Sequence, residues 1–226
     1  MYTNIDGINA TKGGEMNVVI QTEEPDIIFI TESKLSNGAL LAQFIDCQNF
    51  NIYRKDRSHG YGGGVLIMVK NNLPVIELYD GWEDIEAVVC RIRMEPKWVN
   101  VACMYRPPAS SSSYNESVRL AIRRLSAGLQ GQLLICGDFN FKEINWHIKD
   151  VHGGENSEQA KFLDECENCF LHQHVVEFTR SRGTDQPSTL DLVFSRDELE
   201  VDNLEYKPPI GSSDHCVLAF EFRIDV

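Results

Sequence analysis

The sequence lacks several features that would define a class of protein at once. No window approaches the roughly 18 consecutive apolar residues of a membrane-spanning helix, so we expect no membrane segment. The first residues show no basic segment followed by an apolar stretch and a small-residue cleavage site, so we expect no secretory signal. Internal repeats and long linkers are also missing, and mixed α/β domains commonly reach roughly 200–250 residues. We therefore expect one domain over residues 1–226.

The sequence is also short of positive charge. It has 21 Lys and Arg against 34 Asp and Glu, a formal net charge of −13. This argues against a protein that coats nucleic acid with a basic surface. A nuclease, however, needs only local cations and a carboxylate cluster whose charge a bound metal offsets. The acidity lowers the expected affinity for DNA and does not exclude a DNA substrate.

The cysteines form no recognisable framework. There are seven, an odd number, and most lie in apolar runs such as Leu133–Cys136. This is typical of reduced intracellular core cysteines. Cys166 and Cys169 make a lone C-x-x-C pair in a helical pattern, without a second pair or a histidine at ligand spacing. Helix packing is favoured there over a zinc or redox site.

Apolar periodicity predicts short strands and two helices. The strands are expected over residues 26–30, 64–69, 87–92, 99–104, 133–136, 190–194 and 216–222. One helix is expected over Asn115–Leu129, and a second after Asn156, which forms a capping-box pattern with Gln159. The serines at 110–113 are expected to form an exposed loop. Many strands with outer helices predict two packed sheets flanked by helices.

Polar motifs follow two of the predicted strands, where a rigid scaffold displays reactive groups. Glu32 comes after the strand at 26–30, and a carboxylate there suits a hard cation such as magnesium. Asp138 and Asn140 follow Gly137 and alternate on one side of an extended chain, as an acceptor and a donor beside a phosphate. Each has an ordinary alternative, a surface glutamate or a common turn pair.

Two further motifs combine an aspartate with histidine chemistry. Asp214 and His215 precede the last strand, and a histidine can donate to a phosphoryl oxygen while a carboxylate orients it. Asp191 lies between two leucines inside a strand, where a buried aspartate needs a partner. A histidine or backbone amides would satisfy it. Gly62–Gly64, in contrast, precedes a strand and not a helix, so a tight turn is favoured over a nucleotide-binding loop.

The order of these residues is more informative than any single motif. Along the chain the series is Asn4, Glu32, Tyr105, Asp138, Asn140, Asp191, Asp214 and His215. It resembles the endonuclease/exonuclease/phosphatase superfamily, which includes DNase I and the exonuclease III-type abasic endonucleases. The resemblance runs from Tyr2 to Phe222 and implies a four-layered α/β (α+β) sandwich, with two packed mixed β-sheets flanked by helices, like DNase I.

The connecting segments resemble the endonuclease domains of non-LTR retrotransposons. The most specific segments are Tyr105-Arg106-Pro107-Pro108 and Gly137-Asp138-Phe139-Asn140, continued by Ile144-Asn145-Trp146. Pro108 departs from relatives that carry an asparagine three residues after the tyrosine, and a proline cannot donate that hydrogen bond. Pro187-Ser188-Thr189 replaces an aromatic residue of the abasic endonucleases, so a preference for abasic sites is not expected.

The resemblance implies a metal site. Asn4 and Glu32 would hold Mg²⁺, with Mn²⁺ as an alternative, and Asp214 would lie close to the ion or its waters. The ion would act as Lewis acid and template for phosphodiester hydrolysis.

It also implies a role for each catalytic residue. Asp138 would activate the attacking water, assisted by Asn140. His215, oriented by Asp191, would bind the scissile phosphate. Tyr105 would stabilise the developing charge or the leaving group.

Five arginines are candidates for contacts with DNA: Arg54, Arg57, Arg106, Arg180 and Arg182. The last two lie between predicted strands, where resembling endonucleases present a hairpin to DNA. Arginines there would enter a minor groove and read its width and deformability. The hypothesis is that this loop sets the nicking preference.

The sequence therefore predicts a magnesium-dependent endonuclease that nicks one strand of double-stranded DNA, as the target-site-nicking domain of a non-LTR retrotransposon. A reverse transcriptase is expected elsewhere in the parent polyprotein. Such a substrate implies a nuclear location, and otherwise a cytoplasmic one. Two alternatives stay open: a phosphodiesterase of the same fold acting on RNA, inositol-phosphate or lipid substrates, and a catalytically silent binding module.

Overall fold

The predicted strands read as unbroken apolar runs because they lie in the interior of two packed sheets. The computed structural model describes residues 1–79 and 81–224, and in this part of the chain two six-stranded mixed sheets pack face to face. The first sheet, in the order β13-β14-β1-β2-β4-β3, consists of β1 (Tyr2–Asn4), β2 (Ile27–Thr31), β3 (Phe50–Lys55), β4 (Val65–Lys70), β13 (Val201–Lys207) and β14 (Val217–Phe222). The second, in the order β11-β12-β8-β7-β6-β5, consists of β5 (Val75–Leu78), β6 (Glu86–Met94), β7 (Lys97–Tyr105), β8 (Gln132–Asp138), β11 (His172–Gln173) and β12 (Asp191–Ser195).

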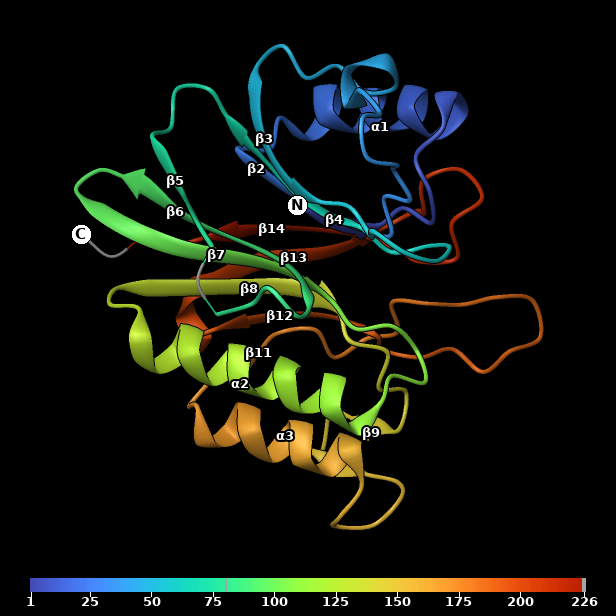
Figure 1. Cartoon of the computed structure of the whole chain (residues 1–226), viewed down its shortest axis with the longest axis vertical. Helices are drawn as coiled ribbons and strands as arrows, with labels where there is room; N and C mark the ends of the chain where they lie inside the picture. The colour runs from blue at the N-terminus through green and yellow to red at the C-terminus, as the bar shows by residue number, and fades with distance from the viewer. Residues whose placement is uncertain (80, 225–226) are drawn as a thin grey trace.

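Helices cover the outer face of each sheet, which gives four layers (Figure 1). Helix α1 (Ala10–Glu23) lies on the first sheet, and α2 (Ser112–Gly128) and α3 (Glu158–Asn168) lie on the second. Two short 3-10 turns, η1 (Leu41–Gln43) and η2 (Glu198–Glu200), and a small hairpin of β9 (Ile144–Asn145) and β10 (Asp150–Val151) complete the elements. Within the described residues, no helix has the length and apolar character needed to cross a membrane.

Side chains alternate along the central strands and fill both sides of the second sheet. On β6 and β8, Val88 and Leu134 point between the two sheets, whereas Ala87 and Leu133 point towards α2 and α3. Met16 of α1 packs on the outer side of the first sheet in the same way. A strand covered on both faces carries apolar residues at every position, which is why periodicity found these strands.

Two parallel strand pairs bring the polar motifs to one end of the sandwich. Strand β1 runs parallel to β2 with Asn4 opposite Thr31, and β7 runs parallel to β8 with Tyr105 opposite Asp138. Strand β12 then starts beside the end of β8, with Asp191 opposite Asp138. Loops that leave these strand ends therefore meet at one edge, to the right in Figure 1.

Every predicted strand is present with small shifts at its ends, but one helix was missed. Two helices were predicted, and the structure adds α1 near the N-terminus. Gly13 and Gly14 lower the intrinsic helix propensity of this segment. Gly13 is nevertheless needed, because a Cβ there would lie 2.2 Å from the backbone oxygen of Phe44. Close packing of the α1 backbone requires a glycine where an apolar side chain would otherwise stand. The segment therefore lacks the apolar periodicity from which a helix is predicted.

The starts of the two predicted helices also differ from the prediction. Ser157, not Asn156, is the N-cap of α3, and its side chain accepts a hydrogen bond from the backbone N–H of Ala160. Helix α2 begins at Ser112 with Ser111 as its N-cap, so the serine run predicted as a loop contains a helix start. Serine hydroxyls at both positions accept from the first turn and fix where each helix begins.

Candidate active site

The polar motifs meet in a cleft of about 650 Å³ at the loop end of the sandwich. Seven of the eight residues in the predicted series line it: Asn4, Glu32, Tyr105, Asp138, Asn140, Asp214 and His215. The eighth, Asp191, lies directly behind His215 and is fully buried. The fold therefore brings together residues at or next to the ends of six strands, β1, β2, β7, β8, β12 and β14.

Asp138 ends β8 and is almost completely buried. Its Oδ2 accepts a hydrogen bond of 2.8 Å from Nδ2 of Asn4, and its Oδ1 accepts one of 3.0 Å from the backbone N–H of Asn140. Burial, and next the charge of Asp191, raise the pKa of Asp138 to about 7. A carboxylate with a pKa near neutrality is suited to take a proton from water.

His215 and Asp191 form a buried pair. Nδ1 of His215 donates to Oδ2 of Asp191 over 2.7 Å, and Oδ1 of Asp191 accepts 2.7 Å from the hydroxyl of Tyr2. Burial by itself would lower the pKa of His215, but the charge and hydrogen bond of Asp191 outweigh it and raise this pKa to about 9. The imidazole is thus held as a cation whose Nε2 is directed away from Asp191.

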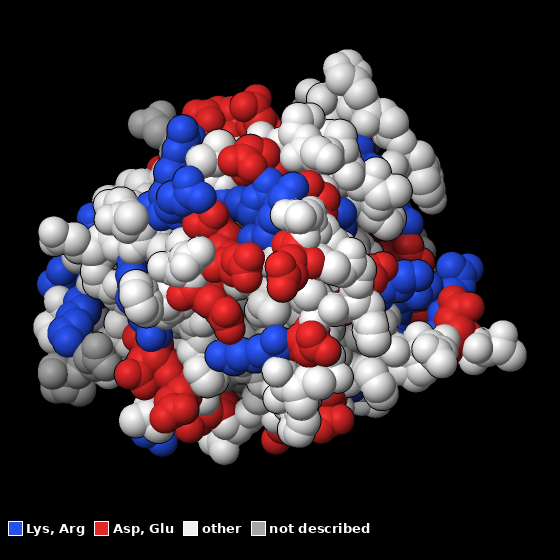
Figure 2. Space-filling model, turned by 90° about the horizontal axis from the view of Figure 1, so that it is seen from below, with Lys and Arg blue, Asp and Glu red and all other residues white. Residues whose placement is uncertain are grey.

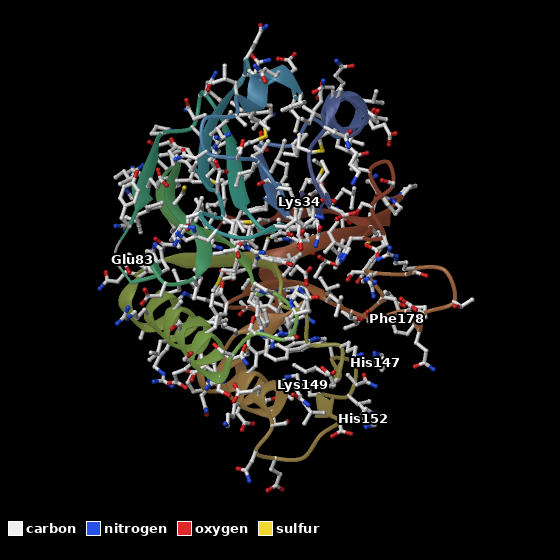
Figure 3. The ribbon with its side chains drawn as sticks, turned by 45° about the vertical axis from the view of Figure 1, so that its right-hand side comes forward. Lys34, Glu83, His147, Lys149, His152 and Phe178 are labelled. Carbon is white, nitrogen blue, oxygen red and sulfur yellow. The ribbon has the colours of Figure 1, made fainter. Side chains whose placement is uncertain are left out.

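Glu32 lies immediately after β2 on a strained backbone. Its φ of 54° is in the left-handed region, which is uncommon for a residue with a side chain. Oε1 accepts a short hydrogen bond from the Tyr105 hydroxyl, and Oε2 lies 3.4 Å from Nζ of Lys34. Figure 3 shows Lys34 among the loops where the two sheets meet. Asn140, at φ 51°, has the same kind of backbone, and such strain clusters at functional sites.

Oxygen donors of the cleft fit a hard divalent cation. Asn4, Glu32 and Asp214 all line the same cavity and offer an amide oxygen and carboxylates, the ligands that Mg²⁺ prefers. A neighbouring group of Asp138, Asp191 and His215 has ligand atoms within 4.8 Å of one another and could also hold an ion. In that group, however, His215 already donates to Asp191. Asn4, Glu32 and Asp214 form a separate set of oxygen donors, of the kind that a hard divalent cation prefers.

An extended arm, residues 179–188, projects from the sandwich (Figure 1), and several of its residues line the cleft. At its base, Arg180 forms isolated antiparallel β-bridges with Ser188 and with His215, which fix the position of the arm. Nε of Arg180 donates to Oδ2 of Asp214 over 2.9 Å, so this arginine is tied to a candidate metal ligand. Arg182 lines the cleft further along the arm. Figure 3 shows Phe178, which is largely exposed, at the base of the arm.

The three other candidate arginines are placed differently. Arg106 is buried, where it donates to Asn115 and to the backbone oxygens of Phe139 and Asn140. Its guanidinium is thus used within the fold and does not line the cleft. Arg54 pairs with Asp56 over 3.1 Å and lines a separate surface hollow.

Arg57 supports the site indirectly. Its guanidinium donates to Glu86 and to the backbone oxygen of Tyr61, and it lies 5.8 Å from the centroid of the Tyr105 ring. Glu86 in turn accepts from the backbone N–H of Gly64. The glycines at 62–64 form the predicted tight turn, since all three have positive φ.

The helical face of the molecule carries both signs of charge. Figure 2 shows basic and acidic side chains interspersed on the side of α2 and α3. Arg119 pairs there with Glu116 and Glu158, and Arg123 pairs with Glu165. Cations neutralised in this way do not make a basic patch. The cleft and its arm remain the better place for a contact with a polyanion.

Several residues of the site were not singled out from the sequence. Tyr2 donates to Asp191, Lys34 contacts Glu32, and the Thr179 hydroxyl accepts from the backbone N–H groups of Leu190 and Asp191. The resemblance to known endonucleases begins at Tyr2, two residues before Asn4, which was the available signal for this residue. Lysine and threonine carry no such pattern, because their role depends on contacts between distant segments.

Comparisons with known proteins agree with this fold. Residues 99–219 match the family model described as endonuclease-reverse transcriptase. No curated protein sequence matches the chain. Among solved structures, the endonuclease domain of TRAS1, a telomere-specific non-LTR retrotransposon, is 18% identical with a TM-score of 0.74, and the alignment covers 100% of this chain and 98% of that one.

Two further solved structures are also similar to this chain. The AP endonuclease LMAP from Leishmania major is 15% identical with a TM-score of 0.76, over 98% of this chain and 86% of that one. The 3′ phosphatase NExo from Neisseria, bound to a product DNA hairpin, is 14% identical with a TM-score of 0.74, over 98% of each chain. At such low identity these structures show a shared fold.

The match to the family model extends over more than half of the chain and includes Tyr105, Asp138, Asp191 and His215. Together with the four-layered fold shared with the TRAS1 endonuclease domain, it shows that the chain belongs to the endonuclease-reverse transcriptase family, within the endonuclease/exonuclease/phosphatase superfamily.

Proposed function

We propose that this protein is a metal-dependent endonuclease that hydrolyses one phosphodiester bond in one strand of double-stranded DNA. In this proposal it is the target-site-nicking domain of a non-LTR retrotransposon, with a reverse transcriptase elsewhere in the parent polyprotein. The family description and the likeness to the TRAS1 domain support this role. Nuclear DNA would be the target, so the protein would act in the nucleus.

The observation that best supports the proposal is that one cleft contains both a proton acceptor, Asp138, and a cationic hydrogen-bond donor, His215. The carboxylate of Asp138 and the imidazole of His215 line the same cavity. Asp191 orients His215 from behind, and Asn4 and Asn140 orient Asp138. A water and a phosphate placed between the two groups would meet a base on one side and a positive donor on the other.

The chemistry follows from these positions. Asn4 and Glu32, with Asp214 nearby, would hold Mg²⁺, which would supply positive charge to the phosphate. Asp138 accepts the proton of the attacking water, and His215 donates from Nε2 to a phosphate oxygen. Tyr105 stabilises the leaving oxygen or the developing charge. Its pKa is raised well above the usual range by burial and by the hydrogen bond to Glu32, so it remains a protonated donor.

For DNA contacts we propose the arm, with Arg182 and Arg180 directed to the phosphates or to a minor groove. Both line the cleft. Two arginines allow only weak sequence specificity, read as groove shape. Arg54 and Arg57 stay proposals as outer contacts, while the buried position of Arg106 favours a structural role.

A supercoiled-plasmid nicking assay tests the proposal. We expect open-circle product that requires Mg²⁺, is abolished by EDTA, and falls at least about 100-fold in Asp138→Ala and His215→Ala. Asp164→Ala and His152→Ala, two exposed positions away from the cleft, are matched controls that should nick normally. Absence of nicking by the folded wild-type protein at low salt would refute the proposal.

A second candidate keeps the fold and changes the substrate. The net charge of −13 and the few cations of the cleft favour a smaller anion than duplex DNA, and NExo shows that a similar fold carries 3′ phosphatase activity. Phosphate release from RNA ends, inositol phosphates or lipid headgroups, without plasmid nicking, would support this candidate. A folded protein that binds no divalent cation would instead be the silent binding module.

A further inference from the structure

Helix α1 contains a buried lysine that the chemistry above does not use. Lys12 lies in the first turn of α1 and is 4% exposed. Its Nζ donates to the backbone oxygens of Ile5 over 2.8 Å and Asp6 over 2.7 Å. A cation is unfavourable near a helix N-terminus, and burying an ammonium is costly. Contacts specific to this place must offset both costs.

The two carbonyls that Lys12 holds belong to the turn that follows Asn4. Asp6 adopts a left-handed backbone, with φ 50°, which is strained for a residue with a side chain. The N–H of this same residue donates to Oδ1 of Asn4 over 3.0 Å. The Asn4 amide then donates from Nδ2 to Oδ2 of Asp138. A continuous set of hydrogen bonds thus connects Lys12 with the side chains at the cleft.

The same end of α1 contacts a second loop of the site. A Cβ at Gly211 would lie 2.9 Å from Cγ of Lys12, so this turn packs directly on the lysine stem. The backbone N–H of Gly211 donates to Glu15 of α1 over 2.6 Å. Two residues later, the Ser213 hydroxyl donates to the backbone oxygen of Asn4 over 2.7 Å. Helix α1 therefore holds together the loops that carry Asn4 and Asp214.

We propose that Lys12 is a positioning residue for the cation site: it fixes the turn after Asn4 so that the Asn4 amide oxygen faces the ion and its amide nitrogen holds Asp138. The inference rests on the proposed function, because it assigns Asn4 to the metal. Lys12 itself does not line the cleft. Groups that orient a metal ligand from behind commonly change metal affinity by roughly 10- to 100-fold when removed.

Lys12→Met tests the inference, since it keeps the apolar stem and removes the three N–H donors. Mn²⁺ binding is measured by titration calorimetry on the full chain without DNA. We expect the Mn²⁺ dissociation constant to rise at least about tenfold. In plasmid nicking, the Mg²⁺ concentration for half-maximal rate should rise likewise, while KM for DNA at saturating Mg²⁺ changes less than about twofold. Lys12→Arg should restore part of the affinity.

Lys161→Met is the matched control, because Lys161 is an exposed lysine of α3 paired with Glu158. It should bind Mn²⁺ as the wild type does. If Lys12→Met does not fold, as judged by circular dichroism, Gly211→Ala replaces it, since its Cβ would displace the Lys12 stem without removing the charge. We expect weaker Mn²⁺ binding there too, although strain from the positive φ of Gly211 adds a loss of stability.

The outcomes separate this inference from the proposed function. A folded Lys12→Met protein with wild-type Mn²⁺ affinity overturns the positioning role, whether or not the wild type nicks DNA. A wild type that binds Mn²⁺ without nicking overturns the proposed function, and weaker binding by the variant would still support Lys12. A rise in KM for DNA without a change in Mn²⁺ affinity would assign Lys12 to the substrate and reject the inference.

Discussion

The hydroxyl of Tyr2 donates a hydrogen bond of 2.7 Å to Oδ1 of Asp191, which is 189 residues away in the chain. Tyr2 lies on β1 of the first sheet and Asp191 on β12 of the second, so this bond joins the sheets beneath the cleft. Both residues are fully buried. The other carboxylate oxygen of Asp191 binds His215, and the orientation of the imidazole therefore depends on both sheets.

Tyr2→Phe should weaken both activity and stability. Removing the hydroxyl leaves Oδ1 of Asp191 buried with one donor fewer, which costs about 1–3 kcal/mol of unfolding free energy. Because Asp191 becomes free to turn, we also expect kcat for nicking to fall about tenfold with little change in KM. Urea unfolding and plasmid nicking measure the two effects. Tyr79→Phe, at an exposed tyrosine, is the control, and equal losses in both variants would contradict the prediction.

Asp191→Asn should reduce activity far more than stability. The amide is nearly isosteric and can still accept from Tyr2, but it no longer supplies the charge that keeps His215 cationic. We expect kcat to fall on the order of 100-fold or more, as when an orienting aspartate is replaced beside a catalytic histidine. Single-turnover nicking at saturating Mg²⁺ measures the chemical step. A variant within about threefold of the wild type would show that His215 needs no charged partner.

The strands and the polar residues of the candidate site were predictable from the sequence because they leave local signals. Strands such as β2 and β8 are buried on both faces and read as apolar runs that end at Glu32 and Asp138. The order of these residues along the chain indicated the family resemblance. That resemblance in turn predicted that they meet in one cleft. Parallel pairing of β1 with β2 and of β7 with β8 is the physical reason that they meet.

Features that depend on contacts between distant segments were not predictable. Helix α1 was missed because Gly13 packs against the backbone at Phe44 and interrupts the apolar stripe. Arg106 carries the same charge as Arg182, yet it is buried under Asn115 and Phe141 while Arg182 lines the cleft. Composition and spacing do not distinguish an arginine that is buried and stabilises the fold from one that is exposed in a cleft and can bind a ligand.

Acid should destabilise the protein through His174. This residue follows β11, its Nε2 lies 2.7 Å from the Ser195 hydroxyl, and its ring lies 4.6 Å from that of His172. Burial, and next the nearby His172, lower the pKa of His174 to about 4. Between about pH 6.5 and about pH 4, the His174 ring is therefore protonated in the unfolded chain but neutral in the folded chain. The stability contributed by the neutral ring is complete above about pH 6.5 and is lost as the pH falls towards about 4.

Urea unfolding of wild type and His174→Gln, at about pH 7.5 and about pH 5, measures this effect. Glutamine keeps an N–H donor for Ser195 and does not titrate. The loss of stability on acidification should be smaller in the variant by on the order of 1 kcal/mol, a figure reduced for the partial exposure of the ring. His152→Gln, at an exposed histidine, should behave as the wild type. Identical pH dependence in all three proteins would remove His174 as the cause.

Replacing Arg180 or Arg182 by alanine should affect nicking and DNA binding in different ways. Arg180 donates to Asp214, so its loss disturbs a candidate metal ligand, and we expect the Mg²⁺ requirement for nicking to rise. Arg182 lines the cleft from the arm and forms no ion pair with another described residue, so its charge is available to a phosphate. Loss of one phosphate contact lowers the slope of log affinity against log salt by roughly 0.9.

DNA binding at several salt concentrations, in Ca²⁺ to prevent cleavage, therefore separates the two arginines. Arg182→Ala should lower the salt slope and keep the wild-type Mg²⁺ requirement. It should also change the pattern of nicks on a long duplex, because an arginine in a narrow minor groove reads its width. An unchanged salt slope together with an unchanged nick pattern would mean that the arm does not touch DNA. The duplex would then have to be held by other cations near the cleft, such as Lys34, whose Nζ lies 3.4 Å from Glu32 and 5.1 Å from the centroid of the Tyr61 ring.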